Sequence, residues 1–173
     1  MRLDDPSFAK RHKRGSAPLY TLEQRRRRDA SVWTLVQGIL APLQFLVFLV
    51  SVALVGRYFM AGEGAFAANV SIVVKTCTLY LIMVTGSVWE KVVFGKWLFV
   101  PAFFWEDVFS MLVLALHTAY LVALVVGLGT ERGRMLLALA AYASYAINAT
   151  QFLLKLRAAR LQATTPSALA VAG

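Results

Sequence analysis

Residues 103–120, FFWEDVFSMLVLALHTAY, decide how the rest of the chain is interpreted. They follow Pro101, which suits the start of a helix, and they open a run of residues 108–128 whose only charged or histidine residue is His117. A helix of this length and composition can cross a bilayer core of about 30 Å. The stretch therefore predicts a membrane-spanning helix with two acids at its mouth and a histidine inside.

The two acids do not point the same way on this helix. At 100° per residue, Glu106 shares a face with His117, whereas Asp107 points about 80° away from it. The shared face also carries Ser110 and Val113. Glu106 and His117 are separated by about 16 Å along the axis, so they cannot form a hydrogen bond. Either one large ligand spans both groups, or the two groups have separate tasks.

The composition is that of an integral membrane protein. Of the 173 residues, 59% are hydrophobic, and the mean hydropathy is +0.64. The net charge is +9, but nine of the 18 Lys and Arg residues precede Trp33. This cluster indicates a cytoplasmic anchor beside anionic lipid and argues against nucleic-acid binding. Cys77 is the only cysteine, which excludes an intrachain disulfide or a CxxC metal site.

Hydropathy and turn signals predict an all-α fold, a bundle of four membrane-spanning helices. The predicted spans are residues 33–59, 66–89, 103–128 and 135–156, within a domain of residues 21–160. Residues 1–20 are predicted to be a disordered basic tail and 161–173 a flexible tail. Thr21 and Gln24 predict a capping box, and Pro42 predicts a kink in the first span. Both termini are predicted to be cytoplasmic, with the helices in the inner membrane.

Counting about 1.5 Å per residue from the cytoplasmic ends gives each polar residue a depth in the membrane. The residues near the midplane are Gln44, His117 and Tyr145, and those slightly deeper are Lys75 and Tyr142. The shallower residues are Gln37, Asn148 and Gln151. The cytoplasmic end is lined by the acids Glu90, Glu106 and Asp107 and by the aromatic residues Trp89, Phe103, Phe104 and Trp105. Each residue also has a structural interpretation, as helix-helix contact, packing group or helix cap. The convergence at matched depths favours a pocket that opens to the cytoplasm.

Four segments carry a resemblance to a known family. They are DASVWTLVQGILAPLQFLVFLVS (29–51), YLIMVTGSVWEKVVFGKWLFVPAFFWEDVFSM (80–111), ALHTAYL (115–121) and NATQFLLKLRAAR (148–160). The chain resembles the 3-vinyl (bacterio)chlorophyllide hydratases of bacteriochlorophyll biosynthesis over about residues 19–161. The resemblance implies that water adds across the C3 vinyl group of a magnesium chlorin, without a redox cofactor or an added metal, and yields a 1-hydroxyethyl group.

The candidate residues suit this chemistry, which needs an acid, a positioned water and an apolar slot for a flat pigment. Glu106 or Asp107 is the predicted acid, with Glu90 as the alternative. His117 either binds the chlorin magnesium as an axial ligand or activates water, and Lys75 pairs with a pigment carboxylate or stabilises the bundle. The remaining predicted substrate-binding residues are Gln37, Gln44, Tyr145 and Asn148, with Trp89, Trp105, Phe103 and Phe104 stacking on the macrocycle.

Two other functions remain open at this point. The first is a non-enzymatic carrier or assembly factor that holds a chlorin through His117 and passes it on. The second is a small transporter or channel, which Lys75 favours but which the lack of an inverted repeat disfavours. An association with other pigment-biosynthesis enzymes is expected, because the substrate is poorly soluble in water.

Overall fold

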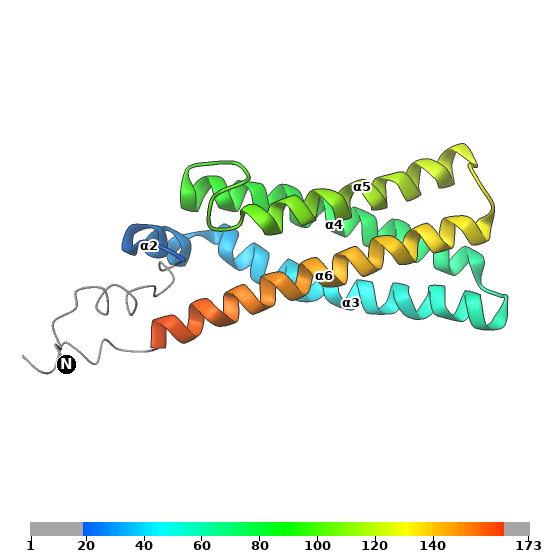
Figure 1. Cartoon of the computed structure of the whole chain (residues 1–173), viewed down its shortest axis with the longest axis horizontal. Coiled ribbons are helices and arrows are strands. Elements are labelled where there is room, and N and C mark those ends of the chain that lie inside the picture. Colours follow the sequence, from blue (N-terminus) through cyan, green and yellow to red (C-terminus); the bar gives the residue numbers. More distant parts are fainter. Residues whose placement is uncertain (1–18, 165–173) are drawn as a thin grey trace, which may run out of the picture.

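The computed structural model describes residues 19–164, and Figure 1 shows long helices lying along one axis with a short helix at one end. The described elements are α2 (Leu22–Ala30), α3 (Val32–Ala61), α4 (Ala65–Phe94), α5 (Phe104–Val126) and α6 (Glu131–Thr164), and this part of the chain contains no strand. The predicted all-α class is therefore confirmed. Of the two predicted tails, residues 1–18 and 165–173 lie outside the described range, whereas residues 161–164 belong to α6.

Helices α4 and α6 differ most from their predicted spans. Helix α4 continues to Phe94, so Glu90 lies inside a helix and not in a surface connection. Gly95 ends α4 in the left-handed conformation, with φ of 81°. Helix α6 begins at Glu131 and not at residue 135. The Thr130 hydroxyl accepts a hydrogen bond from the backbone N–H of Gly133 at 3.1 Å, which satisfies a donor of the first turn and lets the helix start early.

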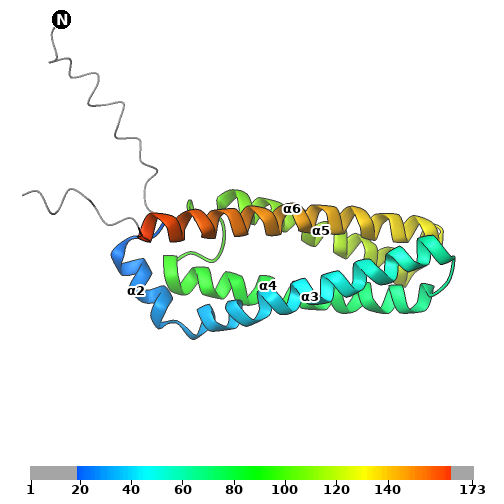
Figure 2. The ribbon, with the colours of Figure 1, turned by 90° about the horizontal axis from the view of Figure 1, so that it is seen from below.

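The helices form two antiparallel hairpins, α3–α4 and α5–α6, that lie against each other (Figures 1 and 2). Packing is closest within each hairpin, and the contacts between hairpins are made by α4 with α5 and by α3 with α6. Helix α2, the connection of residues 95–103 and the end of α6 gather at one end, called here the α2 end (Figure 1). The structure thus confirms that the chain enters and leaves the bundle at the same end.

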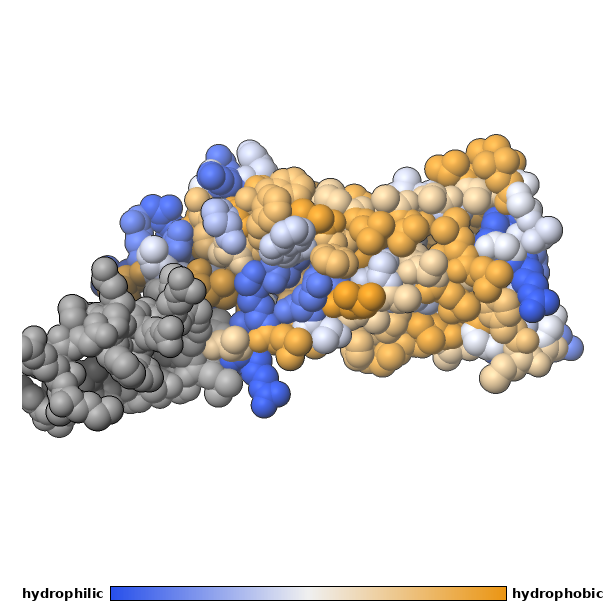
Figure 3. Space-filling model, viewed as in Figure 1, coloured by the Kyte–Doolittle hydropathy of each residue, from blue (hydrophilic) through white to orange (hydrophobic). Residues whose placement is uncertain are grey.

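An apolar outer surface covers the length of the bundle. Figure 3 shows this surface as an orange band, with hydrophilic residues concentrated toward the ends. Helices α3, α4, α5 and residues 131–158 of α6 are long and apolar enough to cross a membrane. Large apolar side chains such as Leu46, Val84 and Val125 are exposed on this surface. Such exposure is costly in water but favourable against lipid, so four membrane spans are the consistent interpretation.

Helix α2 carries the basic cluster at the α2 end. Its capping box is formed as predicted: the Thr21 hydroxyl accepts from the Gln24 N–H at 3.2 Å, and the Gln24 side chain accepts from the Thr21 N–H at 2.9 Å. The last turn is attached to α3, because the Thr34 hydroxyl donates to the Arg28 carbonyl at 2.6 Å. The Arg28 guanidinium also lies over the Tyr20 ring, 4.8 Å from its centroid. These contacts place four consecutive arginines beside the bundle.

Gly95 offers a test of how the α2 end is held. Its φ of 81° is costly for any residue with a Cβ, so Gly95→Ala is expected to destabilise the protein by about 1–2 kcal/mol. Thermal unfolding in detergent measures this. Gly56→Ala is the matched control, because Gly56 lies inside α3 and nothing lies within 4 Å of an added Cβ there. Equal melting temperatures for the two variants would contradict the argument.

Candidate functional site

Buried polar side chains from all four long helices line the interface between the two hairpins. Buried groups include Gln44 and Ser51 of α3, Lys75 and Glu90 of α4, Asp107, Ser110 and His117 of α5, and Tyr142, Tyr145 and Asn148 of α6. Several of their atoms have no hydrogen-bond partner within the described residues: Gln44 Oε1, Lys75 Nζ, Glu90 Oε2, His117 Nε2 and Asn148 Oδ1. Unpaired polar atoms are costly inside a membrane protein and mark functional sites. This interface is therefore the candidate site.

At the α2 end, Glu90 and Asp107 form a pair of buried carboxyl groups. They are only 5% and 4% exposed, and they lie close enough to interact electrostatically with each other. Asp107 Oδ2 also accepts the backbone N–H of Phe99 at 2.8 Å. Phe99 holds a positive φ of 57°, which is uncommon for a residue other than glycine. The connection of residues 95–103 therefore folds over the carboxyl pair and keeps Asp107 inside, although the helical wheel points it away from His117.

The third acid has a different environment. Glu106 Oε2 accepts a hydrogen bond from Lys155 Nζ of α6 at 2.6 Å, so its charge is neutralised by an ion pair. The Lys155 ammonium also lies 5.1 Å from the centroid of the Phe103 ring. The sequence analysis did not predict this pairing. A helix-helix ion pair leaves Glu106 less suited than its neighbour to give up a proton.

Near the middle of the bundle, Lys75 and His117 are both fully buried. The Lys75 ammonium lies over the Tyr145 ring, 3.9 Å from its centroid, and it interacts electrostatically with His117. The His117 Nδ1 lies 2.8 Å from the Val113 carbonyl oxygen. Since a carbonyl can only accept, Nδ1 carries the proton and Nε2 presents a lone pair. The His117 ring also packs against Tyr142, with centroids 5.9 Å apart.

Polar contacts between these groups join helices within each hairpin and across the two hairpins. Asn148 of α6 donates to the Ser110 hydroxyl of α5 at 2.8 Å. Ser51 of α3 contacts the Tyr142 hydroxyl of α6 and lies 2.7 Å from the Ser71 hydroxyl. Serines in apolar helices gave no distinctive sequence signal, so Ser51 and Ser71 were not predicted. Their hydrogen bonds hold α3, α4 and α6 in register around the site.

The remaining predicted residues divide between the site and the outer surface. Gln37 is half-buried and donates to the Thr85 hydroxyl at 2.8 Å, and Trp89 donates to the Thr34 hydroxyl at 2.9 Å. Phe103 is buried, and the Trp89 ring packs on it with centroids 5.8 Å apart. Phe104 and Trp105, in contrast, are 43% and 67% exposed. Phe104 and Trp105 thus face outward, so the structure does not bring them to the buried polar groups.

An open groove of about 650 Å³ on the outer face of α5 lies apart from this chemistry. Its lining is apolar except for Thr118, whose hydroxyl lies 2.8 Å from the Tyr80 hydroxyl. It contains no charged residue, so it offers no acid or base for a reaction. Among the described residues, no group of three or more His, Cys, Asp or Glu side chains could hold a metal ion.

Comparison with known proteins gives a consistent result. The family described as 2-vinyl bacteriochlorophyllide hydratase (BCHF) matches residues 20–158. The 2-vinyl bacteriochlorophyllide hydratase of Rhodobacter capsulatus is 65% identical over 87% of this chain and 87% of its own length. The protein of the same name from Cereibacter sphaeroides is 67% identical over 83% of this chain and 89% of its own length.

No solved structure matches the chain. The family match nevertheless covers every membrane-spanning helix and every candidate residue in the interface between the hairpins. The resemblance noted from the four sequence segments is thereby confirmed, and the chain belongs to the 2-vinyl bacteriochlorophyllide hydratase family.

Proposed function

We propose that the protein adds water across the vinyl group of a bacteriochlorophyllide and forms a 1-hydroxyethyl group, as a step of bacteriochlorophyll biosynthesis. The observation that carries this function is the family match over residues 20–158, with relatives named hydratases at 65% and 67% identity. The ring carbon that bears the vinyl group is numbered 2 in the family's name and 3 in the alternative numbering of the macrocycle, so both names describe one substituent. The protein is therefore a hydro-lyase whose substrate is a magnesium chlorin.

The Glu90–Asp107 pair is the proposed general acid. Two carboxyl groups in contact in an apolar setting favour a state in which one of them keeps a proton, because two adjacent negative charges repel. Glu90 Oε2 is buried and unpaired, so it is free to face a substrate. The Phe99 N–H stabilises the negative charge on Asp107. The pair can therefore give up a proton and accept one again.

The reaction balances with this pair alone. The carboxylic acid gives its proton to the terminal vinyl carbon, which becomes a methyl group, and the positive charge moves to the inner carbon, where the macrocycle delocalises it. A water oxygen then bonds to the inner carbon. The carboxylate removes the extra proton of that water and returns to its starting state. No electron is transferred, so no redox cofactor is needed.

His117 is proposed to bind the magnesium of the substrate. Its Nε2 lone pair is buried and unpaired, and its ring is oriented by the contact of Nδ1 with Val113, an arrangement typical of histidine ligands. A water-activating role would require His117 to lie near the vinyl group. His117 is ten residues from Asp107 on α5, about 15 Å along the axis, which suits a ligand at the centre of the macrocycle better.

We expect His117→Ala to weaken binding of the magnesium pigment by about tenfold or more, because an axial ligand is lost. Binding of the same pigment without magnesium should change little, which separates ligation from packing. Pigment binding is measured by fluorescence quenching in detergent. An unchanged affinity together with a loss of turnover would instead assign water activation to His117.

The remaining parts of the proposal concern the surroundings of the site. The basic cluster of α2 and Lys91, Lys96 and Arg157 at the α2 end supports a cytoplasmic location for that end, in the inner or a photosynthetic membrane. The buried Phe103, the half-buried Trp89 that packs on it, and Tyr145 are proposed to contact the macrocycle. An association with other pigment-biosynthesis enzymes would protect a substrate that is poorly soluble in water.

The proposed function is tested by incubating membranes that contain the protein with the vinyl pigment and no added cofactor. Loss of the vinyl conjugation should shift the red absorption band to shorter wavelength, and the product should gain the mass of one water. Membranes without the protein are the control. Binding of the pigment with neither change would favour a carrier, which is the alternative function.

A further inference from the structure

Lys75 is a buried cation without a counter-charge. It is 0% exposed, and its Nζ has no hydrogen-bond partner in the described part of the chain. The groups that interact with it are the Tyr145 ring and His117. Neither of these is acidic. The acid on its own helix is Glu90, about 22 Å away along the axis.

An unpaired ammonium at this depth needs compensation. The face of the Tyr145 ring offers part of it, but a cation–π contact does not replace the hydration of a charged amine. If Lys75 served only the stability of the fold, an apolar residue of similar length would serve as well, because burying an unpaired charge is unfavourable. A bound anion would explain both the charge and the free donors.

The part of the site at the α2 end and the part in the middle of the bundle favour ligand groups of opposite charge. At the α2 end, Glu90 and Asp107 are buried together and would repel a negative group, and the charge of Lys155 is already paired with Glu106. In the middle of the bundle, Lys75 is the only buried Lys or Arg side chain among the described residues. A substrate that has an alkene at one edge and a carboxylate at another can therefore bind in only one orientation.

Resting on the hydratase function proposed above, we propose that Lys75 binds the free propionate carboxylate of the chlorin and so orients the macrocycle. The carboxylate lies against Lys75, the magnesium faces His117, and the vinyl edge points to Glu90 and Asp107. Lys75 is thus the residue that selects the free acid over an esterified pigment.

The test compares the free acid with its methyl ester, which has the same macrocycle but no negative charge. Equilibrium binding of each is measured on the full chain in detergent, together with KM and kcat where turnover occurs. The wild-type protein should prefer the free acid by about one to two orders of magnitude. Lys75→Met should abolish this preference by weakening binding of the acid, and it should leave binding of the ester unchanged.

Two further variants make the test specific. Lys75→Arg keeps the charge and should retain part of the preference. Lys96→Met removes an exposed lysine from the connection after α4 and should change nothing. Equal binding of acid and ester by the wild-type protein, or an equal effect of Lys75→Met on both, would overturn the proposal. Because binding is read without turnover, a protein that binds the acid selectively but hydrates nothing would disprove the hydratase function and leave the carboxylate site standing.

Discussion

Replacing Asp107 by Asn is expected to lower the rate of vinyl hydration by about 10²- to 10⁴-fold, the range that a general acid contributes. The change is nearly isosteric, and an amide oxygen can still accept the Phe99 N–H that holds the connection of residues 95–103 in place. What is lost is the carboxyl group that is proposed to share a proton with Glu90. The rate is followed by the shift of the red absorption band and by product mass.

The partner of Asp107 gives an internal check on this prediction. Glu90→Gln should reduce the rate by a similar factor, and the double variant should be little worse than either single one, because the two groups act as a unit. The matched control is the double variant Glu106→Gln, Lys155→Gln, which removes the adjacent acid together with its ion-pair partner. A large loss in this control with a small loss in Asp107→Asn would assign the acid to Glu106.

The outcome for the acids shows what a sequence can and cannot predict here. The apolar run and the helical wheel predicted that residues 103–120 span the membrane with Glu106 on the His117 face, and Glu106 is buried. The wheel could not show that a connection folds over the helix start. That covering, held by the positive φ of Phe99, is what buries Asp107 against Glu90. The sequence of one helix shows which side chains share a face, but the segments that pack around the helix determine how many of its side chains are buried.

The midplane residues were easier to predict. A charge in the middle of an apolar segment has few favourable places, and Lys75, which was placed by depth among the residues of the predicted pocket, is fully buried. Gln44, placed near the midplane of the same pocket, is 3% exposed. The aromatic residues were harder, because Phe104 and Trp105 have the same composition signal as Phe103 but lie on the lipid-facing side. Hydropathy alone does not distinguish a pocket wall from a membrane anchor.

The ion pair at the mouth of the site leads to the second prediction. Lys155→Met is expected to destabilise the protein by about 3 kcal/mol, because it leaves the Glu106 carboxylate, whose side chain is 9% exposed, without a counter-charge. Adding Glu106→Gln should restore most of this loss, since an amide carries no charge to compensate. Thermal unfolding in detergent of the two single variants and the double variant measures the coupling.

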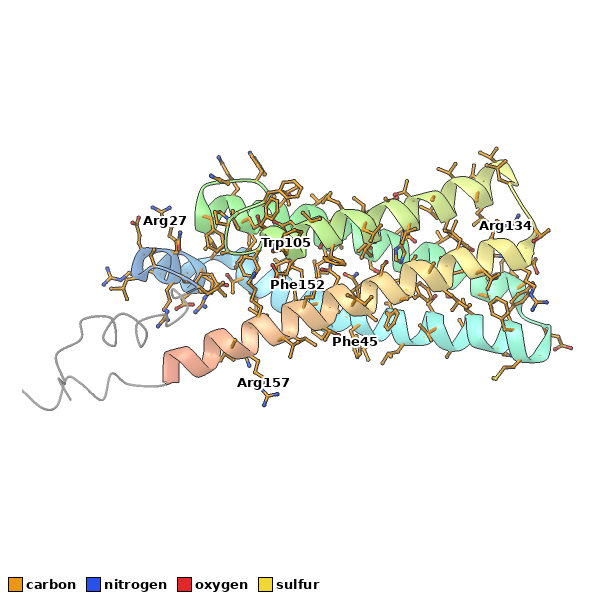
Figure 4. The ribbon with its side chains drawn as sticks, in the orientation of Figure 1. Arg27, Phe45, Trp105, Arg134, Phe152 and Arg157 are labelled. Atoms are coloured by element: carbon orange, nitrogen blue, oxygen red, sulfur yellow. The ribbon has the colours of Figure 1, made fainter. Side chains whose placement is uncertain are left out.

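The control for this cycle lies on the same helix. Arg157 is exposed and points away from the bundle (Figure 4), so Arg157→Met removes a positive charge from the same end without breaking the pair. Its melting temperature should match that of the wild-type protein, which separates the local pair from the general effect of charge at the membrane surface. A coupling near zero between Lys155 and Glu106 would mean that water solvates the pair. In that case α5 and α6 would be held together at the α2 end by the stacked rings of Phe103 and Phe152, whose centroids lie 5.9 Å apart.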